Sequence, residues 1–384
     1  MTDITELFSG ISIIIDDDIE KKDSLQNGIQ KIQNSLKEKQ IPFIQYSQLP
    51  DDELIKNLHS VSFIILDWNL SGMHPISEAV VADNIEFIKH INKICFVPIF
   101  IFSDESSYSI EVELEKENLY SKDICSNIFV KNKSDINNSE QLFSEIENWI
   151  KKTPSMYVVK EWGTEKRKAQ NQMLWELHSI FPQWPHIISK AARDDGVDAN
   201  IKLIQILQRG VEARLSVPDF DKDIIEIKPE KVDKKDIRKI LEYERFLKGD
   251  LLPNNPFSGD VYCIDKKYYL NIRPDCDIVR DEKALLYLLK GNIVDEYRIN
   301  SEEKDCITFD SGEFIEKNNN CYIAFVNENI LEFKFRELEI KNWKEIKSHR
   351  IGRLLPPYIT KIQQKYSFYL QRQGLPAIPK EAIQ

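Results

Sequence analysis

The chain has 384 residues, of which 42% are hydrophobic and 30% charged, and its net charge is −11. This length exceeds what one hydrophobic core usually serves, so we expect two or three domains. No apolar run approaches the roughly 18 to 20 residues that cross a bilayer, and residues 1–6 lack the pattern of a secretory signal. These features exclude a membrane-spanning protein and favour a cytoplasmic one.

Charge is distributed unevenly along the chain. Residues 1–150 carry 12 Lys and Arg against 26 Asp and Glu, whereas residues 341–384 carry 9 against 2. The acidic front disfavours nucleic-acid binding, while the basic end could bind an acidic partner, a nucleic acid or the first domain of the same chain. The 6 cysteines are scattered without a Cys-x-x-Cys pair, which predicts reduced thiols and no zinc site.

Four apolar runs near the N-terminus each end in polar side chains. The runs and the residues that follow them are Ile11–Ile15 with Asp16, Asp17 and Asp18, Val61–Leu66 with Asp67, Phe96–Phe102 with Ser103, and Asn127–Val130 with Lys131. Continuous apolar runs of this length are typical of parallel strands buried on both faces. The polar residues therefore mark the carboxyl ends of strands, where ligands of open α/β sheets bind.

The segments between these runs have the apolar spacing of surface helices. Stripes at intervals of three and four residues occur in residues 25–36, 85–91 and 142–150, and residues 41–46 read as a further strand. Strands that alternate with helices require a parallel sheet covered on both faces. With right-handed crossovers, residues 1–152 are predicted to form a flavodoxin-like, doubly wound, five-stranded α/β domain.

On these residues the first domain resembles the receiver domain of two-component response regulators. The resemblance rests on Asp16-Asp17-Asp18, on Leu66-Asp67-Trp68-Asn69, on Val97–Ser103 and on Val130-Lys131. It implies that a histidine kinase phosphorylates Asp67. It also implies that Asp17, Asp67 and the backbone carbonyl of Asn69 bind Mg²⁺, that Asp16 does so through water, and that Ser103 and Lys131 contact the phosphoryl group.

The chain departs from the receiver pattern at several positions. The spacings between the motif residues are longer than in a compact receiver, Asp104 stands where a small residue is usual, and Asn132 instead of proline follows Lys131. An alternative from the same residues is therefore a receiver fold without phosphotransfer. Any enzymatic activity of this domain would be limited to self-phosphorylation from a phosphodonor and autodephosphorylation.

The rest of the chain predicts two further regions. Residues 151–155 read as a linker and 156–250 as helical, with a break at Pro182 and Pro185. Residues 251–384 predict a small, mostly antiparallel β-sheet or barrel with a basic C-terminal helix. Its expected strands are residues 260–264, 267–272, 306–309, 321–326 and 331–336, and the apolar side of its helix is Ile359, Ile362, Tyr366 and Tyr369.

These features favour a phosphorelay receiver that signals through its C-terminal module or buffers phosphate for the kinase. An extended receiver joined to an unfamiliar C-terminal region resembles the receiver-bearing members of bacterial two-component-like antiphage systems, which implies a role in antiviral defence. Phosphate-dependent homodimers through residues 106–150 and an unidentified downstream effector protein would be its partners. Two alternatives remain open: a DNA-binding transcriptional regulator, and an effector enzyme centred on Asp275-Cys276-Asp277.

Overall fold

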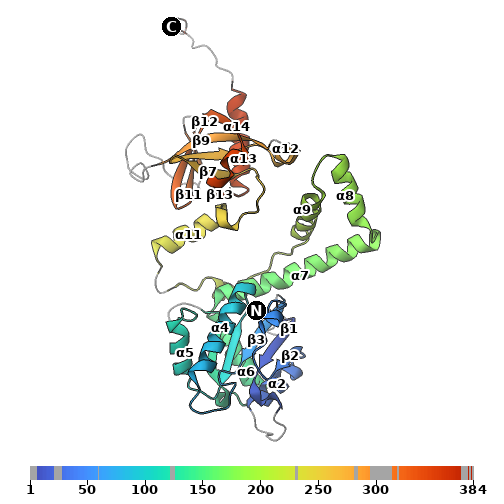
Figure 1. Ribbon diagram of the computed structural model, residues 1–384, viewed down its shortest axis with the longest axis vertical. Helices are drawn as coiled ribbons and strands as arrows, with labels where there is room; N and C mark the ends of the chain where they lie inside the picture. Colours follow the sequence, from blue (N-terminus) through green and yellow to red (C-terminus); the bar gives the residue numbers. More distant parts are fainter. Residues whose placement is uncertain are drawn as a thin grey trace. The chain divides into compact units, whose positions relative to one another are not determined.

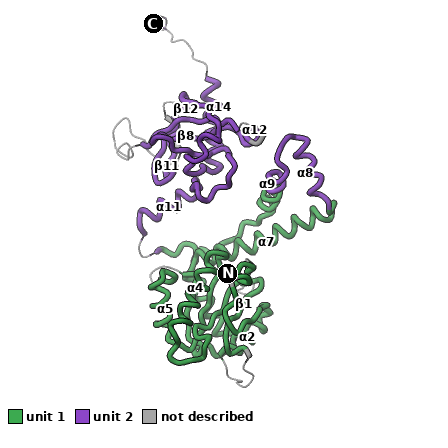
Figure 2. Tube along the Cα trace, in the orientation of Figure 1, with its two compact units in different colours: residues 1–182, 206–228 green, residues 183–205, 229–384 purple. Residues whose placement is uncertain are grey.

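The computed structural model describes residues 7–20, 28–58, 60–121, 126–229, 232–280, 284–294, 314–317, 320–372, 379 and 382. The chain forms two compact units (Figure 2). The first unit comprises residues 1–182 and 206–228, and the second comprises residues 183–205 and 229–384.

A five-stranded, all-parallel sheet forms the centre of the first unit (Figure 1). The strand order is β2-β1-β3-β4-β5, and every neighbouring pair is parallel. The strands are β1 (Ile11–Ile15), β2 (Phe43–Tyr46), β3 (Val61–Leu66), β4 (Ile99–Ser103) and β5 (Ile128–Asn132). They alternate with the helices α2 (Gly28–Glu38), α3 (Asp52–Ile55), α4 (Glu78–Ile94), α5 (Ser107–Lys116) and α6 (Ser139–Lys151). The predicted parallel sheet of five strands is confirmed.

Each face of this sheet has its own hydrophobic core. Along β4, Phe100 and Phe102 point to the core that contains α2 and α6, while Ile99 and Ile101 point to the core that contains α4 and α5. All four side chains are buried. Because successive strand residues face opposite sides, a strand covered on both faces must be apolar at every position. This explains why the continuous apolar runs form the sheet.

Helix α7 (Pro154–Ile180) belongs to the first unit and begins three residues after α6 ends. Pro154 starts it, at a position where its missing N–H costs nothing. Met156 and Tyr157 are buried in the same core as Trp149 of α6, and Lys160 Nζ donates to the carbonyl of Ser62. Residues 151–155 are therefore a tight helix–helix junction instead of the expected linker, and the unit extends past the predicted boundary at residue 152.

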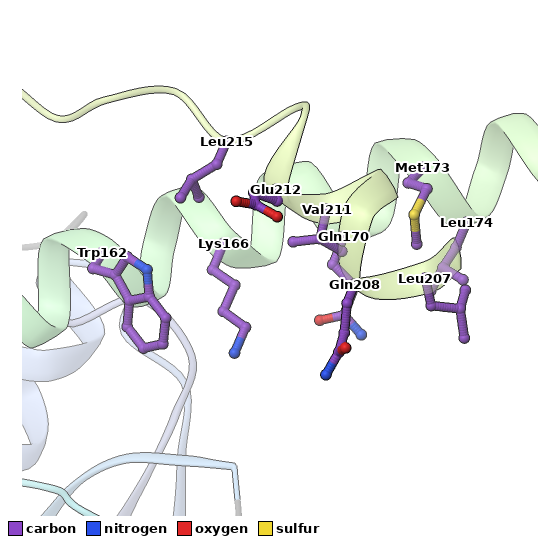
Figure 3. Close-up of a pocket in the computed structure, with 10 residues that line it drawn as sticks. All are labelled: Trp162, Lys166, Gln170, Met173, Leu174, Leu207, Gln208, Val211, Glu212 and Leu215. Atoms are coloured by element: carbon purple, nitrogen blue, oxygen red, sulfur yellow. The ribbon is translucent and has the colours of Figure 1, made fainter. Parts of the chain in front are cut away.

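Two further helices follow α7, as predicted from the break at Pro182 and Pro185. They are α8 (Trp184–Asp194) and α9 (Ala199–Glu212), and the division between the units passes through α9. Helix α9 is amphipathic, yet none of its side chains is fully buried. With α7 it borders an apolar groove of about 480 Å³ between Trp162 and Leu174 on one helix and Leu207 and Val211 on the other (Figure 3).

The second unit contains an eight-stranded antiparallel sheet in the order β10-β11-β12-β9-β8-β7-β13-β6. Its strands are β6 (Phe246–Lys248), β7 (Asp260–Ile264), β8 (Lys267–Asn271), β9 (Leu285–Ile293), β10 (Phe314–Lys317), β11 (Asn320–Val326), β12 (Asn329–Asn342) and β13 (Arg350–Leu354). Its helices include α11 (Lys234–Arg245), α12 (Asp275–Arg280), α13 (Trp343–Ile346) and α14 (Tyr358–Leu370). The short helix α10 (Lys222–Ile225), which precedes them in the chain, belongs to the first unit. The predicted antiparallel sheet and C-terminal helix are confirmed.

Three further expectations concern the C-terminal strands, the cysteines and membrane-spanning helices. Four of the five predicted strands of the C-terminal region are present, and the fifth, at residues 306–309, lies outside the described residues. The described cysteines Cys95, Cys263, Cys276 and Cys321 are free thiols, whereas Cys125 and Cys306 also lie outside them. Within the described part of the chain, no helix has the length and apolar character required to span a membrane.

Candidate functional site

Polar side chains meet where β1, β3 and β4 end, at the carboxyl edge of the parallel sheet. Ile15 of β1 is paired with Leu66 of β3, and Leu66 is paired with Ile101 of β4. The next residues, Asp16 and Asp67, therefore leave the sheet at the same level. Backbone hydrogen bonds hold this edge together, since the amide of Asp67 donates to the carbonyl of Ile15 at 2.8 Å. The strand register thus creates the expected cluster of carboxylates.

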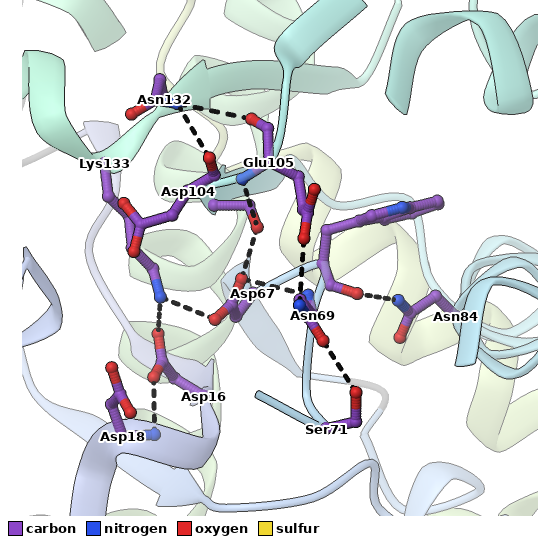
Figure 4. A network of polar contacts seen from close by, with 12 residues as sticks. Asp16, Asp18, Asp67, Asn69, Ser71, Asn84, Asp104, Glu105, Asn132 and Lys133 are labelled. Carbon is purple, nitrogen blue, oxygen red and sulfur yellow. Dashed lines mark hydrogen bonds and ion pairs between the residues drawn. The ribbon is translucent and has the colours of Figure 1, made fainter. Parts of the chain in front are cut away.

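Asp67 lies at the centre of this site and is only 6% exposed. Its Oδ1 accepts a hydrogen bond from Ser103 Oγ at 2.7 Å and one from the amide of Asn69 at 3.2 Å. Its Oδ2 accepts from Lys133 Nζ at 2.7 Å (Figure 4). Both oxygens are therefore held by donors, and the carboxylate has a fixed orientation.

The aspartates after β1 complete the acidic cluster. Oδ2 of Asp16, which is 1% exposed, forms a second ion pair with Lys133 Nζ at 2.7 Å. Its Oδ1 accepts from the amide of Asp18 at 2.9 Å. One carboxylate oxygen from each of Asp16, Asp17 and Asp67 can be chosen so that all three lie within 4.8 Å of one another. Three oxygen ligands at this separation could hold a hard divalent cation such as Mg²⁺.

Burial and charge change the acidity of this cluster. Burial, opposed by Lys133 and reinforced by Asp67, raises the pKa of Asp16 to about 6. For Lys133, burial alone would lower the pKa, but Asp67 and Asp16 outweigh it and the pKa is raised. Lys133 is therefore an ammonium group at neutral pH, and it partly neutralises two carboxylates that would otherwise repel one another.

The prediction that Lys131 reaches this site is wrong. Lys131 Nζ pairs with Glu145 of α6 at 3.3 Å and with Asp135 at 3.9 Å, and its side chain is 29% exposed. The lysine in the site is Lys133, which is 3% exposed. It is the first residue of the 3₁₀ turn that follows β5. The remaining predicted side chains, Asp16, Asp17, Asp67 and Ser103, are brought together.

The physical reason for this error is the length of β5. The apolar residues suggest an end at Val130, but pairing with β4 continues through Lys131 and Asn132, and Asn132 is the partner of Ser103. The first side chain past the strand end is therefore Lys133. Helix α2 can approach this lysine because its first residue is Gly28, where an added Cβ would lie 3.0 Å from the Cβ of Lys133. The alignment of strand ends is the signal that identifies Lys133: Asn132 lies level with Ser103, so the next residue is the first one beyond the sheet.

Residues in the loops around Asp67 form a second polar layer. Nδ2 of Asn69 donates to the carbonyl of Met73 at 2.9 Å and to Glu105 Oε1 at 3.0 Å, and Nδ1 of His74 lies 3.0 Å from the same oxygen. The side chain of Asn69 therefore braces the loop after β3 against the loop after β4 (Figure 4). The backbone carbonyl of Asn69, the predicted metal ligand, accepts a long hydrogen bond of 3.4 Å from the amide of Gly72. The sequence did not identify Glu105 as a member of this polar layer.

The motif Asp275-Cys276-Asp277 lies at the start of α12 in the second unit. Cys276 is exposed, and its Sγ lies 3.6 Å from Asp277 Oδ1. Asp275 Oδ1 accepts a hydrogen bond from the amide of Ser258 at 2.7 Å. The thiol of Cys276 donates to this Asp277 carboxylate, and no described hydrogen bond joins it to a histidine or a lysine. The arrangement therefore gives no support for a nucleophilic cysteine.

No protein-family model, no curated protein and no solved structure matches the chain. A function for the cluster around Asp67 therefore has to be argued from its geometry and chemistry.

Proposed function

We propose that the first unit is a receiver domain that accepts a phosphoryl group on Asp67 from the phosphohistidine of a histidine kinase. The observation that carries this proposal is the convergence of three carboxylates, one hydroxyl and one ammonium at the carboxyl edge of a parallel sheet. The strand order 2-1-3-4-5 is that of flavodoxin-like doubly wound domains, which bind ligands at this edge.

Asp67 is the group best suited to act as the nucleophile. It lies between the other four side chains, and its two oxygens are oriented by Ser103 and Lys133. In the reaction, one Asp67 oxygen attacks phosphorus and forms an acyl phosphate. The P–N bond of the donor breaks, its electron pair returns to the imidazole nitrogen, and that nitrogen takes up a proton from water.

The acidic cluster fits a magnesium ion. Its three carboxylates offer only oxygen ligands, and Lys133 forms ion pairs with two of them, Asp16 and Asp67. Asp16, Asp17 and Asp67, with the backbone carbonyl of Asn69, would hold Mg²⁺, which when bound would neutralise charge and polarise a phosphoryl oxygen. Burial of Asp16 supports this assignment, because a carboxylate with a raised pKa gains from a nearby cation.

Lys133 and Ser103 are the residues that would respond to phosphorylation. Each now donates to Asp67, and each can donate to a phosphoryl oxygen once one carboxylate oxygen has formed the acyl phosphate. Fixed donors aimed at developing negative charge supply much of the rate enhancement in phosphoryl transfer. Loss of either group should therefore slow phosphorylation by about tenfold or more.

Self-phosphorylation from a small donor tests this proposal without the partner kinase. The full chain is incubated with Mg²⁺ and phosphoramidate, whose P–N bond matches that of phosphohistidine, and intact mass is recorded. We expect one added phosphoryl group in the wild type, and none in Asp67→Asn or after chelation of the metal. Asp83→Asn is the matched control, because Asp83 is an exposed aspartate of α4.

A full adduct in Asp67→Asn would refute Asp67 as the acceptor. An adduct that forms equally well in the presence of a chelator would refute the metal assignment alone. The lifetime of the acyl phosphate then separates two roles for the protein. A phosphate sink for the kinase requires rapid hydrolysis, whereas signalling through the second unit requires an adduct that outlives its formation.

A further inference from the structure

We propose that the second unit binds a small zwitterion, a free α-amino acid with a large apolar side chain, in the cavity between α14 and the β-sheet. This cavity has a volume of about 720 Å³, within the range of roughly 300–1,000 Å³ that is usual for ligand pockets. The proposal concerns the second unit alone and does not depend on the function proposed for Asp67.

The two walls of the cavity are fixed to each other. Helix α14 supplies one wall, and its Gln363 Nε2 donates to Ser258 Oγ at 2.8 Å and to the carbonyl of Ile272 at 3.0 Å. Ile359 of the same helix is buried in the core beneath the sheet. The cavity is therefore a preformed space and does not require α14 to move when a ligand binds.

Arg353, whose side chain is 13% exposed, supplies the positive charge of the cavity. Arg353 Nε donates to Asp260 Oδ1 at 2.7 Å, and Asp260 is 0% exposed. The Nη2 of Arg353 donates to the carbonyl of Asn255 at 3.3 Å, and the guanidinium lies over the ring of Phe257 at 4.5 Å from its centroid. Among the described residues, Nη1 has no hydrogen-bond acceptor. An oriented guanidinium with one remaining donor is well suited to bind a carboxylate.

Asp275 supplies the negative charge at the edge of the same cavity. Its Oδ1 accepts from the amide of Ser258, so the carboxylate is held in place while Oδ2 has no donor among the described residues. Asp275 remains an exposed residue at this edge, where partial desolvation raises its pKa and Ser258 and Arg353 oppose this effect. Asp275 and Arg353 form no direct ion pair in the described structure, even though they line one cavity. A ligand with an ammonium and a carboxylate group can satisfy both.

The remaining lining is mostly apolar and selects the ligand side chain. Ile272, Leu355, Ile359, Tyr366 and Leu370 line the cavity. Burial of a leucine or phenylalanine side chain contributes roughly 1.5–3 kcal/mol. The charges fix the backbone of the amino acid and the apolar lining favours a large hydrocarbon side chain. Together these features assign the ligand class.

Calorimetric titration of the full chain with L-leucine and L-phenylalanine tests the proposal. N-acetyl-L-phenylalanine, which lacks the ammonium group, and L-phenylalanine amide, which lacks the carboxylate, are titrated alongside. We expect saturable binding of both amino acids, and a loss of about tenfold to a hundredfold in affinity when either charge is absent.

Asp275→Asn and its neighbour Asp277→Asn form a matched pair of variants. Asp277 lies on the same short helix but does not line the cavity. Asp275→Asn should weaken amino-acid binding at least tenfold and abolish the preference for a free ammonium group, whereas Asp277→Asn should leave both unchanged. Ser367→Trp, on the α14 wall, should block the cavity while the circular dichroism spectrum stays the same.

Three results would overturn the proposal. Absence of saturable binding for both amino acids would show that the cavity is not such a site. Affinities for the N-acetyl and amide analogues that equal the affinity for free L-phenylalanine would show that the cavity binds apolar groups without recognising charge. Equal effects of Asp275→Asn and Asp277→Asn would place the binding elsewhere.

Discussion

Lys133 should stabilise the sheet of the first unit far more than Lys131 does. Lys133 is 3% exposed and forms two ion pairs of 2.7 Å, one to Asp16 and one to Asp67. Lys133→Met removes the ammonium and leaves two buried carboxylates facing each other. Breaking a buried ion pair by removing one partner costs about 3–5 kcal/mol. Protonation of Asp16, whose pKa is already raised to about 6, relieves part of this cost, so we expect a loss of about 3 kcal/mol at neutral pH.

Lys131→Met is the matched control for this experiment. Its side chain is 29% exposed and its ion pair with Glu145 is 3.3 Å long, so solvent screens it and the expected cost is below about 1 kcal/mol. Hydrogen exchange followed by mass spectrometry on peptides from β1 and β3 reports the opening of this sheet alone. A loss of 3 kcal/mol corresponds to protection lowered about a hundredfold.

Exchange should also depend on pH in the Lys133→Met variant. As the pH falls towards 5, Asp16 takes up a proton, the repulsion disappears, and much of the lost protection returns. An equal or larger effect of Lys131→Met would refute the reasoning, because it would mean that burial of the ion pairs does not decide their contribution.

Three further predictions concern other buried groups. The pKa of Asp16 is raised from its usual 3.8 to about 6 by burial, so its contribution to stability falls by about 3 kcal/mol as the pH rises through that window. The difference between the urea-unfolding free energies of the wild type and Asp16→Asn, measured across this pH range, should recover this slope. Burial lowers the pKa of Lys160 from its usual 10.5 to about 7, so its contribution to stability rises as the pH increases from 7 towards 10.5. Lys160→Met should remove that rise in hydrogen-exchange measurements on α7. Gly259→Ala should destabilise the second unit by about 3 kcal/mol. The new Cβ would lie 2.2 Å from the carbonyl oxygen of Leu354, and the backbone φ at this position is +88°. The control is Gly196→Ala, at a φ of +70° with nothing within 4 Å of the new Cβ, which should cost only about 1 kcal/mol in thermal melting.

The sequence predicts the sheet of the first unit well because its central strands β1, β3 and β4 are buried on both faces. Such strands are continuously apolar, and the polar residue that ends each one is visible without any tertiary information. The helices α2 and α6 are equally clear, since their buried residues recur every three or four positions. The end of β5 was misjudged, because Lys131 and Asn132 are polar residues that still pair with β4.

The second unit was harder to predict for two reasons. Strand β9 contains the run Leu285-Leu-Tyr-Leu-Leu, which lacks the alternation that separates a strand from a buried helix. Strand β13 contains two arginines and a glycine, a composition with little tendency to form strands. It is a strand because β6 and β7 pair with it on both sides and because buried Asp260 forms ion pairs with Arg350 and Arg353. These are tertiary interactions that no local pattern reports.

Charge balance connects the architecture of the first unit with its proposed chemistry. When ionised, Asp16, Asp17 and Asp67 together with Lys133 carry a net charge of −2 in one small space. A phosphoryl group adds further negative charge, and like charges at this distance repel strongly where water is excluded. A divalent cation would bring the sum to zero before that charge arrives. Burial raises the pKa of Asp16, Lys133 opposes this effect, and the charge of Asp67 reinforces it. Lys133 forms ion pairs with two of the three carboxylates, and in the proposed reaction a bound divalent cation would supply the further positive charge.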